Sequence, residues 1–272
     1  NATSISHIPA QYYNPLQATP DIYDGPWLTS SQGVGALTFY KFPIVTEFGE
    51  DPMSPAPIVT RIKVYLEGPY DTAGDTMGTE LNPNLPLTQP YGTAPWNYSG
   101  TESVTSMPDS IVDWVLVEVR SGISSTTTID TSAGLLTKTG EITEVDGNKG
   151  ISFQLSEGHY YIVVHHRNHL SIMTSVSQLL NSSANLYDFT ASSGAAYESG
   201  ATKLLESGVY GMITGDANGN GQVQNDDKNA YWKTEVGTAG YKSADFNLNG
   251  QVQNDDKNTF WKSNAGRGTQ VP

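Results

Sequence analysis

The segment IVDWVLVEVR, residues 111–120, is the longest of five runs in this chain that have the character of a β-strand. Branched and aromatic side chains dominate it, and such residues pack well on the pleated surface of a sheet. Turn residues such as Gly68-Pro69 and Glu157-Gly158 separate the runs. The other four are residues 59–67, 151–155, 159–166 and 184–190. Strands in succession without helical periodicity predict a mainly β fold, an antiparallel β-sandwich over residues 34–205.

The composition of the chain argues against nucleic acids and membranes as partners. The chain has 272 residues and a formal net charge of −14, which repels nucleic acid and anionic lipid. It contains no apolar run of about 18 residues, so we expect no membrane insertion. The absence of cysteine excludes disulfides, thiolate metal sites and cysteine nucleophiles.

The decapeptide NGQVQNDDKN occurs twice, at residues 220–229 and 249–258. Each copy belongs to a loop with oxygen-bearing side chains at positions 1, 3, 5 and 12, glycine at 6 and valine at 8. This is the pattern of an EF-hand calcium loop, whose position 7 adds a backbone carbonyl. The sequence therefore predicts two calcium ions. The expected ligands are Asp216, Asn218, Asn220, Gln222 and Asp227 in loop 1 (residues 216–227), and Asp245, Asn247, Asn249, Gln251 and Asp256 in loop 2 (residues 245–256).

Each loop offers carboxylates only at positions 1 and 12, because position 5 is asparagine. So few charged ligands predict weak binding, in the range of about 10⁻⁴–10⁻³ M that extracellular modules use. Such sites fill outside a cell, where calcium would stabilise the fold. The alternative is a pair of asparagine- and aspartate-rich turns without metal.

The loops GDANGNGQVQ and ADFNLNGQVQ, each followed by a short helical segment, resemble the dockerin, a calcium-binding module of bacterial surface proteins. The helical segments are NDDKNAYWK and NDDKNTFWK. The resemblance implies a dockerin-like module at residues 211–264, followed by a C-terminal tail at 265–272. Residues 59–262 also resemble secreted proteins of Bacteroidetes-type bacteria, which implies an extracellular or cell-surface location. The chain begins Asn1-Ala2-Thr3, and we expect an exported protein whose signal peptide has been removed.

The run HHRNH raises a second possible metal site. His165, His166 and His169 lie within five residues and could ligate zinc or copper. Successive residues of a strand point to opposite faces, however, so His165 and His166 cannot share one ion without a bulge. We expect His169 in a turn and structural hydrogen bonding for all three.

The chain shows no convincing catalytic set. Paired carboxylates for glycoside hydrolysis could come from Asp113, Glu118, Glu141 or Glu144. Asp113 and Glu118 stand an odd number of positions apart on one strand, which places them on opposite faces. No G-x-S-x-G sequence occurs. We therefore expect a protein that is not an enzyme.

Two features concern sugars. Tyr91, Trp96 and Tyr98 occur in a loop rich in proline and glycine, where they could stack on a carbohydrate or plug the end of the sandwich. Three Asp-Ser/Thr-aliphatic triplets resemble the O-glycan acceptors of Bacteroidetes-type secreted proteins. The acceptors implied by that resemblance are Thr72, Thr76 and Ser110.

An extended N-terminal segment, residues 1–33, precedes the sandwich. Its first 20 residues contain no Lys, Arg, Asp or Glu, and prolines interrupt them. They could pack on their own domain or lie in a groove or sheet edge of a neighbour. Donation to a neighbour is a head-to-tail contact, which repeats into a filament. The candidate assembly contacts are Ile5, Ile8, Tyr12, Tyr13, Trp232 and Trp261, with Tyr231 and Phe260 beside the two tryptophans. The alternative for the four aromatic residues of the module is that they fill its own small core.

These features lead to one functional hypothesis and one alternative. The hypothesis is a secreted, calcium-stabilised structural protein that assembles with copies of itself into an extracellular fibre. The alternative is a cell-surface docking or carbohydrate-binding module of a polysaccharide-utilising or adhesive system, whose partner is a glycan or a surface protein.

Overall fold

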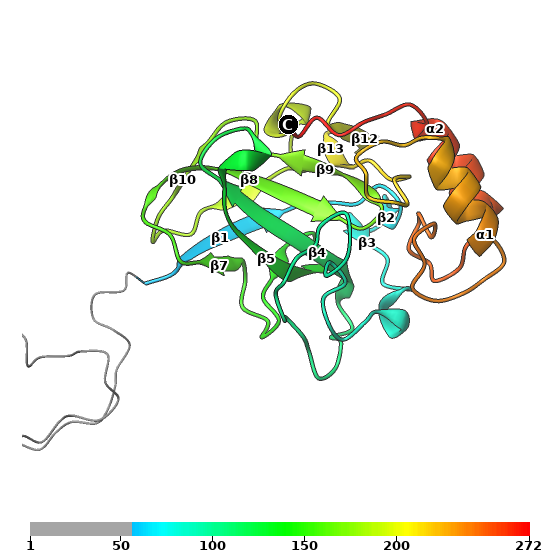
Figure 1. Ribbon diagram of the computed structural model, residues 1–272, viewed down its shortest axis with the longest axis horizontal. Helices are drawn as coiled ribbons and strands as arrows, with labels where there is room; N and C mark the ends of the chain where they lie inside the picture. The colour runs from blue at the N-terminus through cyan, green and yellow to red at the C-terminus, as the bar shows by residue number, and fades with distance from the viewer. Residues whose placement is uncertain (1–55) are drawn as a thin grey trace, which may run out of the picture. The chain divides into compact units, whose positions relative to one another are not determined.

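The computed structural model describes residues 56–272, which belong to one compact unit, Glu50–Pro272. The predictions for the N-terminal segment 1–33, for Ile5, Ile8, Tyr12 and Tyr13, and for the first part of the sandwich lie outside the described residues. Within them the protein is mainly β, as predicted, and its sheets are largely antiparallel (Figure 1).

The larger sheet is built around β4, all ten residues of which are buried. Apolar side chains on both faces of a strand are typical of a central position, and β4 pairs antiparallel on both sides. Its neighbours are β5 and β8, and further strands extend the sheet from these two. The members are β4 (Ile111–Arg120), β5 (Thr128–Thr137), β6 (Ile142–Thr143), β8 (Gly158–His166), β9 (His169–Met173) and β10 (Gln178–Leu180).

The second sheet has the order β11–β1–β7. Its strands are β1 (Ile58–Lys63), β7 (Ile151–Phe153) and β11 (Leu186–Asp188). The β1–β7 pair is antiparallel and the β1–β11 pair is parallel. Ile62 and Phe153 from this sheet join Trp114 and Leu135 from the larger one in a single buried cluster. This shared core makes the body a β-sandwich.

Two hairpins and three 3₁₀ turns complete the body. The hairpins are β2 (Tyr70–Asp71) with β3 (Thr76–Met77), and β12 (Thr202–Glu206) with β13 (Val209–Met212). The turns are η2 (Asn82–Asn84), η3 (Ser125–Thr127) and η4 (Ser193–Ala195). None of the helices in the described part of the chain is long and apolar enough to cross a membrane.

The strand predictions were accurate at the centre of the fold and less so elsewhere. β4 has the predicted bounds, whereas β1 ends at Lys63, short of the predicted residue 67. The prediction missed β5 because four of its first five residues are polar, and this first half is a strand through its pairing with β4. His169 was expected in a turn, but it is the first residue of β9 and is buried.

Both repeats form the expected short helices. After loop 1 a π-helical segment, η5 (Asp227–Trp232), continues into α1 (Lys233–Glu235). After loop 2 the corresponding elements are η6 (Asp256–Trp261) and α2 (Lys262–Asn264). Figure 1 shows α1 and α2 next to each other, and hydrogen bonds join the two repeats.

Candidate metal centre

The two loops are closed by the same hydrogen bonds. In loop 1 the Asp216 carboxylate accepts from the backbone N–H groups of Asn220 (3.1 Å) and Gly221 (2.8 Å). In loop 2 Asp245 accepts from Asn249 (3.1 Å) and Gly250 (2.9 Å). Both glycines at position 6 have a positive φ, 82° and 80°, a conformation that favours glycine. The predicted sharp turn is therefore present in both loops.

The asparagines at positions 3 and 5 continue this pattern. Asn218 Oδ1 accepts from the N–H of Asn220 at 3.0 Å, and Asn220 Oδ1 accepts from the N–H of Gln222 at 2.9 Å. Asn247 and Asn249 accept in the same way in loop 2, at 3.1 and 2.9 Å. These bonds fix the orientation of the amide side chains along the inside of each turn.

The aspartates at position 12 close each loop from its far end. Asp227 accepts from the N–H groups of Asn218 at 3.4 Å and Gln224 at 2.7 Å. Asp256 accepts from Phe246 at 2.8 Å and Gln253 at 2.7 Å. Each loop thus brings together all four predicted side-chain ligands.

The four carboxylates are buried, at 0–2% exposed. Burial raises the pKa of Asp216 to about 7, and the nearby Asp227 carboxylate adds to that rise. Burial also raises the pKa of Asp245 to about 7, against the opposing charge of Arg167. None of the four forms an ion pair with a basic side chain among residues 56–272. Buried carboxylates of this kind are suited to a cation.

The donor chemistry favours a hard cation such as calcium. Each loop presents two carboxylates, two amide oxygens and a backbone carbonyl, all of which are oxygen donors. The described residues contain no group of three or more His, Cys, Asp or Glu side chains arranged for a metal. Because each loop has only two carboxylates, a calcium ion here would depend on amide and carbonyl oxygens.

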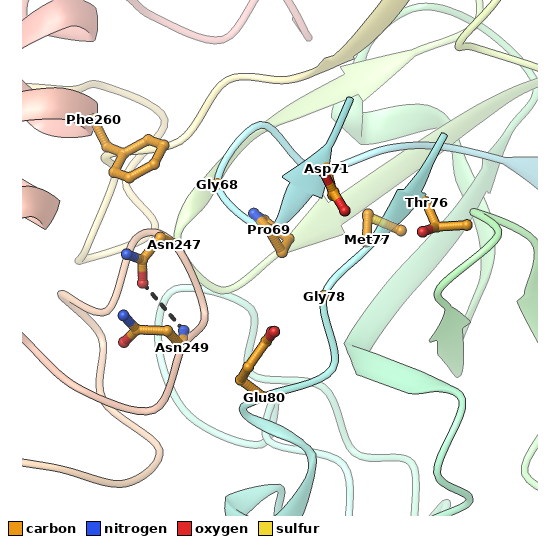
Figure 2. A pocket seen from close by; sticks show the side chains of 10 residues that line it. All are labelled: Gly68, Pro69, Asp71, Thr76, Met77, Gly78, Glu80, Asn247, Asn249 and Phe260. Atoms are coloured by element: carbon orange, nitrogen blue, oxygen red, sulfur yellow. Dashed lines mark hydrogen bonds between the residues drawn. The ribbon is translucent and has the colours of Figure 1, made fainter. Parts of the chain in front are cut away.

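A cleft of about 350 Å³ adjoins loop 2. Figure 2 shows Asn247 and Asn249 on one side of this cleft and Asp71 on the other, with Glu80 between them. Two further carboxylates therefore lie in the cleft that loop 2 borders, and their charge makes this region more favourable for a cation.

The two repeats cover each other reciprocally. Trp232, from the first repeat, donates to the carbonyl of Gln253 in loop 2 at 2.7 Å, and Lys257 lies 4.2 Å from its ring centre. Trp261, from the second repeat, donates to the carbonyl of Gln224 in loop 1 at 3.0 Å, and Lys228 lies 4.7 Å from its ring centre. Each tryptophan thus packs on the loop of the other repeat.

The residues that follow each helix also contact the loop of the other repeat. After α1, Gly237 donates to the carbonyl of Val252 in loop 2. After α2, Gly266 donates to the carbonyl of Val223 in loop 1, and the Val223 N–H donates back to Arg267. The predicted C-terminal tail, residues 265–272, therefore forms backbone hydrogen bonds with loop 1 and helps to hold it in place.

The aromatic side chains predicted as assembly contacts have partners inside the chain. Tyr231, Trp232, Phe260 and Trp261 are half-buried and pack on a small core. That core consists of Ala217, Ala244, Phe246 and Val252. This arrangement matches the role of filling the module's own core, and a contribution of Trp232 and Trp261 to assembly stays a prediction.

We expect Trp232→Ala and Trp261→Ala to lower the free energy of unfolding by similar amounts, about 2–4 kcal/mol each. The reason is that each substitution removes packing on the module's core, an indole hydrogen bond and a cation–π contact. Trp261 also packs on the buried cluster of Leu170, Ile213 and Val223. Urea unfolding measures both, and Leu204→Ala, which is 55% exposed, is the control that should change little. A large loss in one tryptophan variant alone would contradict the energetic equivalence of the repeats.

Asn168, inside the HHRNH run, links both loops to the sandwich. Its backbone carbonyl accepts from the N–H groups of Gly215 and Asp216 at the start of loop 1. Its side-chain amide donates to the carbonyls of Ser243 (3.0 Å) and Asp245 (2.8 Å) at the start of loop 2. This role of Asn168 was not predicted from the sequence, although a polar run directly after an apolar strand was a visible signal.

The three histidines of that run do not converge on one point. His165 lies between Glu118 (2.9 Å) and Ser171 (2.8 Å). His166 contacts Asp113 at 3.3 Å, and its ring nitrogen is 3.0 Å from that of His169. Burial lowers the pKa of both His166 and His169. All three take part in structural hydrogen bonds.

The four candidate acids have separate partners. Burial opposes ionisation of Asp113, but Arg167 and His166 lower its pKa to about 2. Glu118 is bound by Arg120 and His165. Glu141 pairs with Arg61 and Lys149, and Glu144 accepts from the N–H of Ser152 at 2.8 Å.

The residues considered for sugars fall into two groups. Tyr91 is not available for stacking, since it is fully buried and donates to the carbonyl of Trp114 at 2.8 Å. Trp96 and Tyr98 are half-buried and line a pocket. Of the glycan acceptors implied by resemblance, Thr72 and Ser110 are exposed, and Thr76 is half-buried in β3.

Comparisons with known proteins establish no family. No family model matches the chain, and no curated protein sequence matches it. A chain of the crystal structure of the Coh3ScaB-XDoc_M1ScaA complex, an N-terminal interface mutant of a type II cohesin–X-dockerin complex from Acetivibrio cellulolyticus, is similar with a TM-score of 0.35 and 13% identity. The alignment covers 57% of this chain and 82% of that chain.

Proposed function

We propose that this protein is a secreted, calcium-stabilised structural protein without enzymatic activity, and that it assembles with itself outside the cell. The observation that most directly supports the structural role is that Asn168 of the sandwich forms hydrogen bonds with both loops. A segment held in this way acts as a clamp on its own body. Calcium bound in the two loops would then stabilise the whole subunit.

Further bonds between the repeats and the sandwich support the role of a clamp. The Glu67 carboxylate accepts from the Thr214 N–H at 3.1 Å and from the Asn264 side chain at 2.7 Å. The Thr214 hydroxyl donates to the carbonyl of Phe246 at 3.1 Å. Thr269 donates to the carbonyl of Ser171 at 2.8 Å. Both ends of the duplicated segment are therefore tied to the sandwich.

Self-assembly is the finer part of the proposal, and it depends on residues 1–20. These residues are uncharged and rich in apolar side chains, as expected of a segment that binds a groove or edge of another copy. A fibre subunit also needs a body that resists unfolding, which the calcium clamp would provide.

Deletion of residues 1–20 should abolish fibre formation and leave the sandwich folded. Electron microscopy of the full chain in about millimolar calcium is the direct test. We expect regular fibres from the full chain and dispersed particles from the deletion variant, with equal thermal unfolding of both. Fibres formed by the deletion variant would contradict donation, and dispersed full-length particles would favour the alternative of a docking or carbohydrate-binding module.

A further inference from the structure

A pocket of about 460 Å³ lies over the face of β4 that carries Leu116, Glu118 and Arg120. Its volume is within the usual range of small-molecule sites, about 300–1,000 Å³. Its lining includes the aromatic Trp96 and Tyr98, the hydroxyl-bearing Ser99, Ser125 and Thr131, and the charged pair Glu118 and Arg120. The calcium hypothesis uses none of these side chains.

The aromatic wall of the pocket is held in place. Trp96 packs edge-on against the buried Tyr91, with ring centres 5.0 Å apart at 87°. On another side it meets loop 1, because a Cβ atom added at Gly219 would lie 2.7 Å from its ring. Tyr98 is anchored by a hydrogen bond from its hydroxyl to Glu102. An aromatic surface fixed in this way costs little conformational entropy when a ligand binds.

The floor of the pocket is polar, but its positive and negative charges pair with each other. Arg120 donates to both oxygens of Glu118, at 2.7 and 3.0 Å, and its remaining Nη1 donates to the carbonyls of Ile123 and Pro272. Burial opposes ionisation of Glu118, but hydrogen bonds from His165, Arg120 and Thr128 lower its pKa to about 2. Because the guanidinium is already matched by a carboxylate, the floor has little attraction for a phosphate or a carboxylate ligand.

We propose that this pocket binds a neutral hexopyranose, with a C–H face of the ring against Trp96 and Tyr98 and its hydroxyls toward the rim. A sugar ring combines an apolar face with hydroxyls around its edge, and the pocket combines an aromatic wall with hydroxyl groups of Ser99, Ser125 and Thr131. Among the described residues, Glu118 is the one carboxylate that lines the pocket, whereas glycoside hydrolysis ordinarily uses two. The inference is therefore binding, and it goes beyond the structural role proposed above.

Saturation-transfer NMR on the full chain tests this directly, with the methyl glycosides of glucose, galactose and mannose as probes. We expect transfer to the ring protons of at least one of them. Ser99→Trp should abolish it by filling the pocket, and Ser106→Trp, at a serine that is also exposed but lies outside the lining, should keep it. Trp96→Ala should weaken binding about tenfold or more.

Thermal unfolding of each variant checks that the fold is retained, and Ser99→Trp is expected to unfold like the wild type because Ser99 is exposed. Absence of transfer from all three glycosides would overturn the proposal. So would transfer that survives in Ser99→Trp, or transfer lost equally in Ser106→Trp. None of these outcomes depends on whether the protein forms fibres.

Discussion

Replacing Asp216 and Asp245 together by asparagine should remove most of the stabilisation that calcium gives. In about 10 mM calcium we expect the double variant to lose roughly 3–5 kcal/mol of unfolding free energy relative to the wild type. This follows from a dissociation constant of about 10⁻⁴ M, at which each filled site adds about 2.7 kcal/mol. For a domain of this size the loss corresponds to a fall in Tm of about 10–15 °C.

The chain provides a matched control. Asp226 and Asp255 stand at position 11 of the two loops, next to Asp227 and Asp256, and both are exposed. Asp226→Asn with Asp255→Asn removes the same formal charge without touching a predicted ligand. We expect this control to keep its calcium response in differential scanning calorimetry. Equal Tm values for the wild type in calcium and in EGTA would contradict a calcium clamp.

The same carboxylates predict opposite pH trends with and without calcium. In EGTA the pKa of Asp216 and Asp245 is about 7 in the folded protein, against an ordinary value of 3.8. A raised pKa favours the folded state at low pH, so this contribution is lost as pH rises from about 4 to 7. Calcium needs the deprotonated carboxylates, so its stabilising effect should grow over the same range. Tm measured at several pH values in calcium and in EGTA checks both trends.

Asn168→Ala should lower the free energy of unfolding by about 3–5 kcal/mol. The substitution leaves the carbonyls of Ser243 and Asp245 without their amide donor, and His169 without the Asn168 Oδ1. The residue is fully buried, and each buried polar group left without a partner costs about 1–3 kcal/mol. Because Asp245 begins loop 2, we also expect weaker calcium binding, measured by isothermal titration calorimetry.

Asn148→Ala is the comparison for this prediction. Asn148 lies in an exposed turn, where its side chain bonds only Asp146 among the described residues. Its loss should change stability by less than about 0.5 kcal/mol. If the two alanine variants were equally stable, Asn168 would not be the link between the loops and the sandwich.

Local sequence was sufficient for β4 and for the internal geometry of the two loops. β4 is buried along its full length and seven of its ten side chains are apolar, and the loop pattern specifies position, residue type and turn together. The positive φ of Gly221 and Gly250 and the asparagine hydrogen bonds follow from the pattern within each loop. Short-range rules apply here because the interactions themselves are short-range.

Contacts between distant segments could not be predicted in the same way. β5 is a strand because β4 pairs with it, and its first five residues, 128–132, are polar except for the exposed Ile129 and carry no clear strand signal. The sequence left open whether Tyr91 stacks on a carbohydrate or plugs the end of the sandwich, and its burial and the hydrogen bond from its hydroxyl to the Trp114 carbonyl place it in the core. The reciprocal positions of Trp232 and Trp261 depend on two helices packing together, which a repeat in the sequence does not specify.

The links between the duplicated segment and the sandwich have a consequence for the order of events after synthesis. Asn264 bonds Glu67, 197 positions earlier, and Arg120 bonds the carbonyl of Pro272. A ribosome adds about 5–20 residues per second, so Asn264 is synthesised roughly 10–40 s after Glu67. The sandwich therefore lacks these hydrogen bonds until residues 264–272 have been synthesised. Under the proposed extracellular function, a chain exported before that moment would complete its fold only outside the cell, and the two loops would become able to bind calcium there.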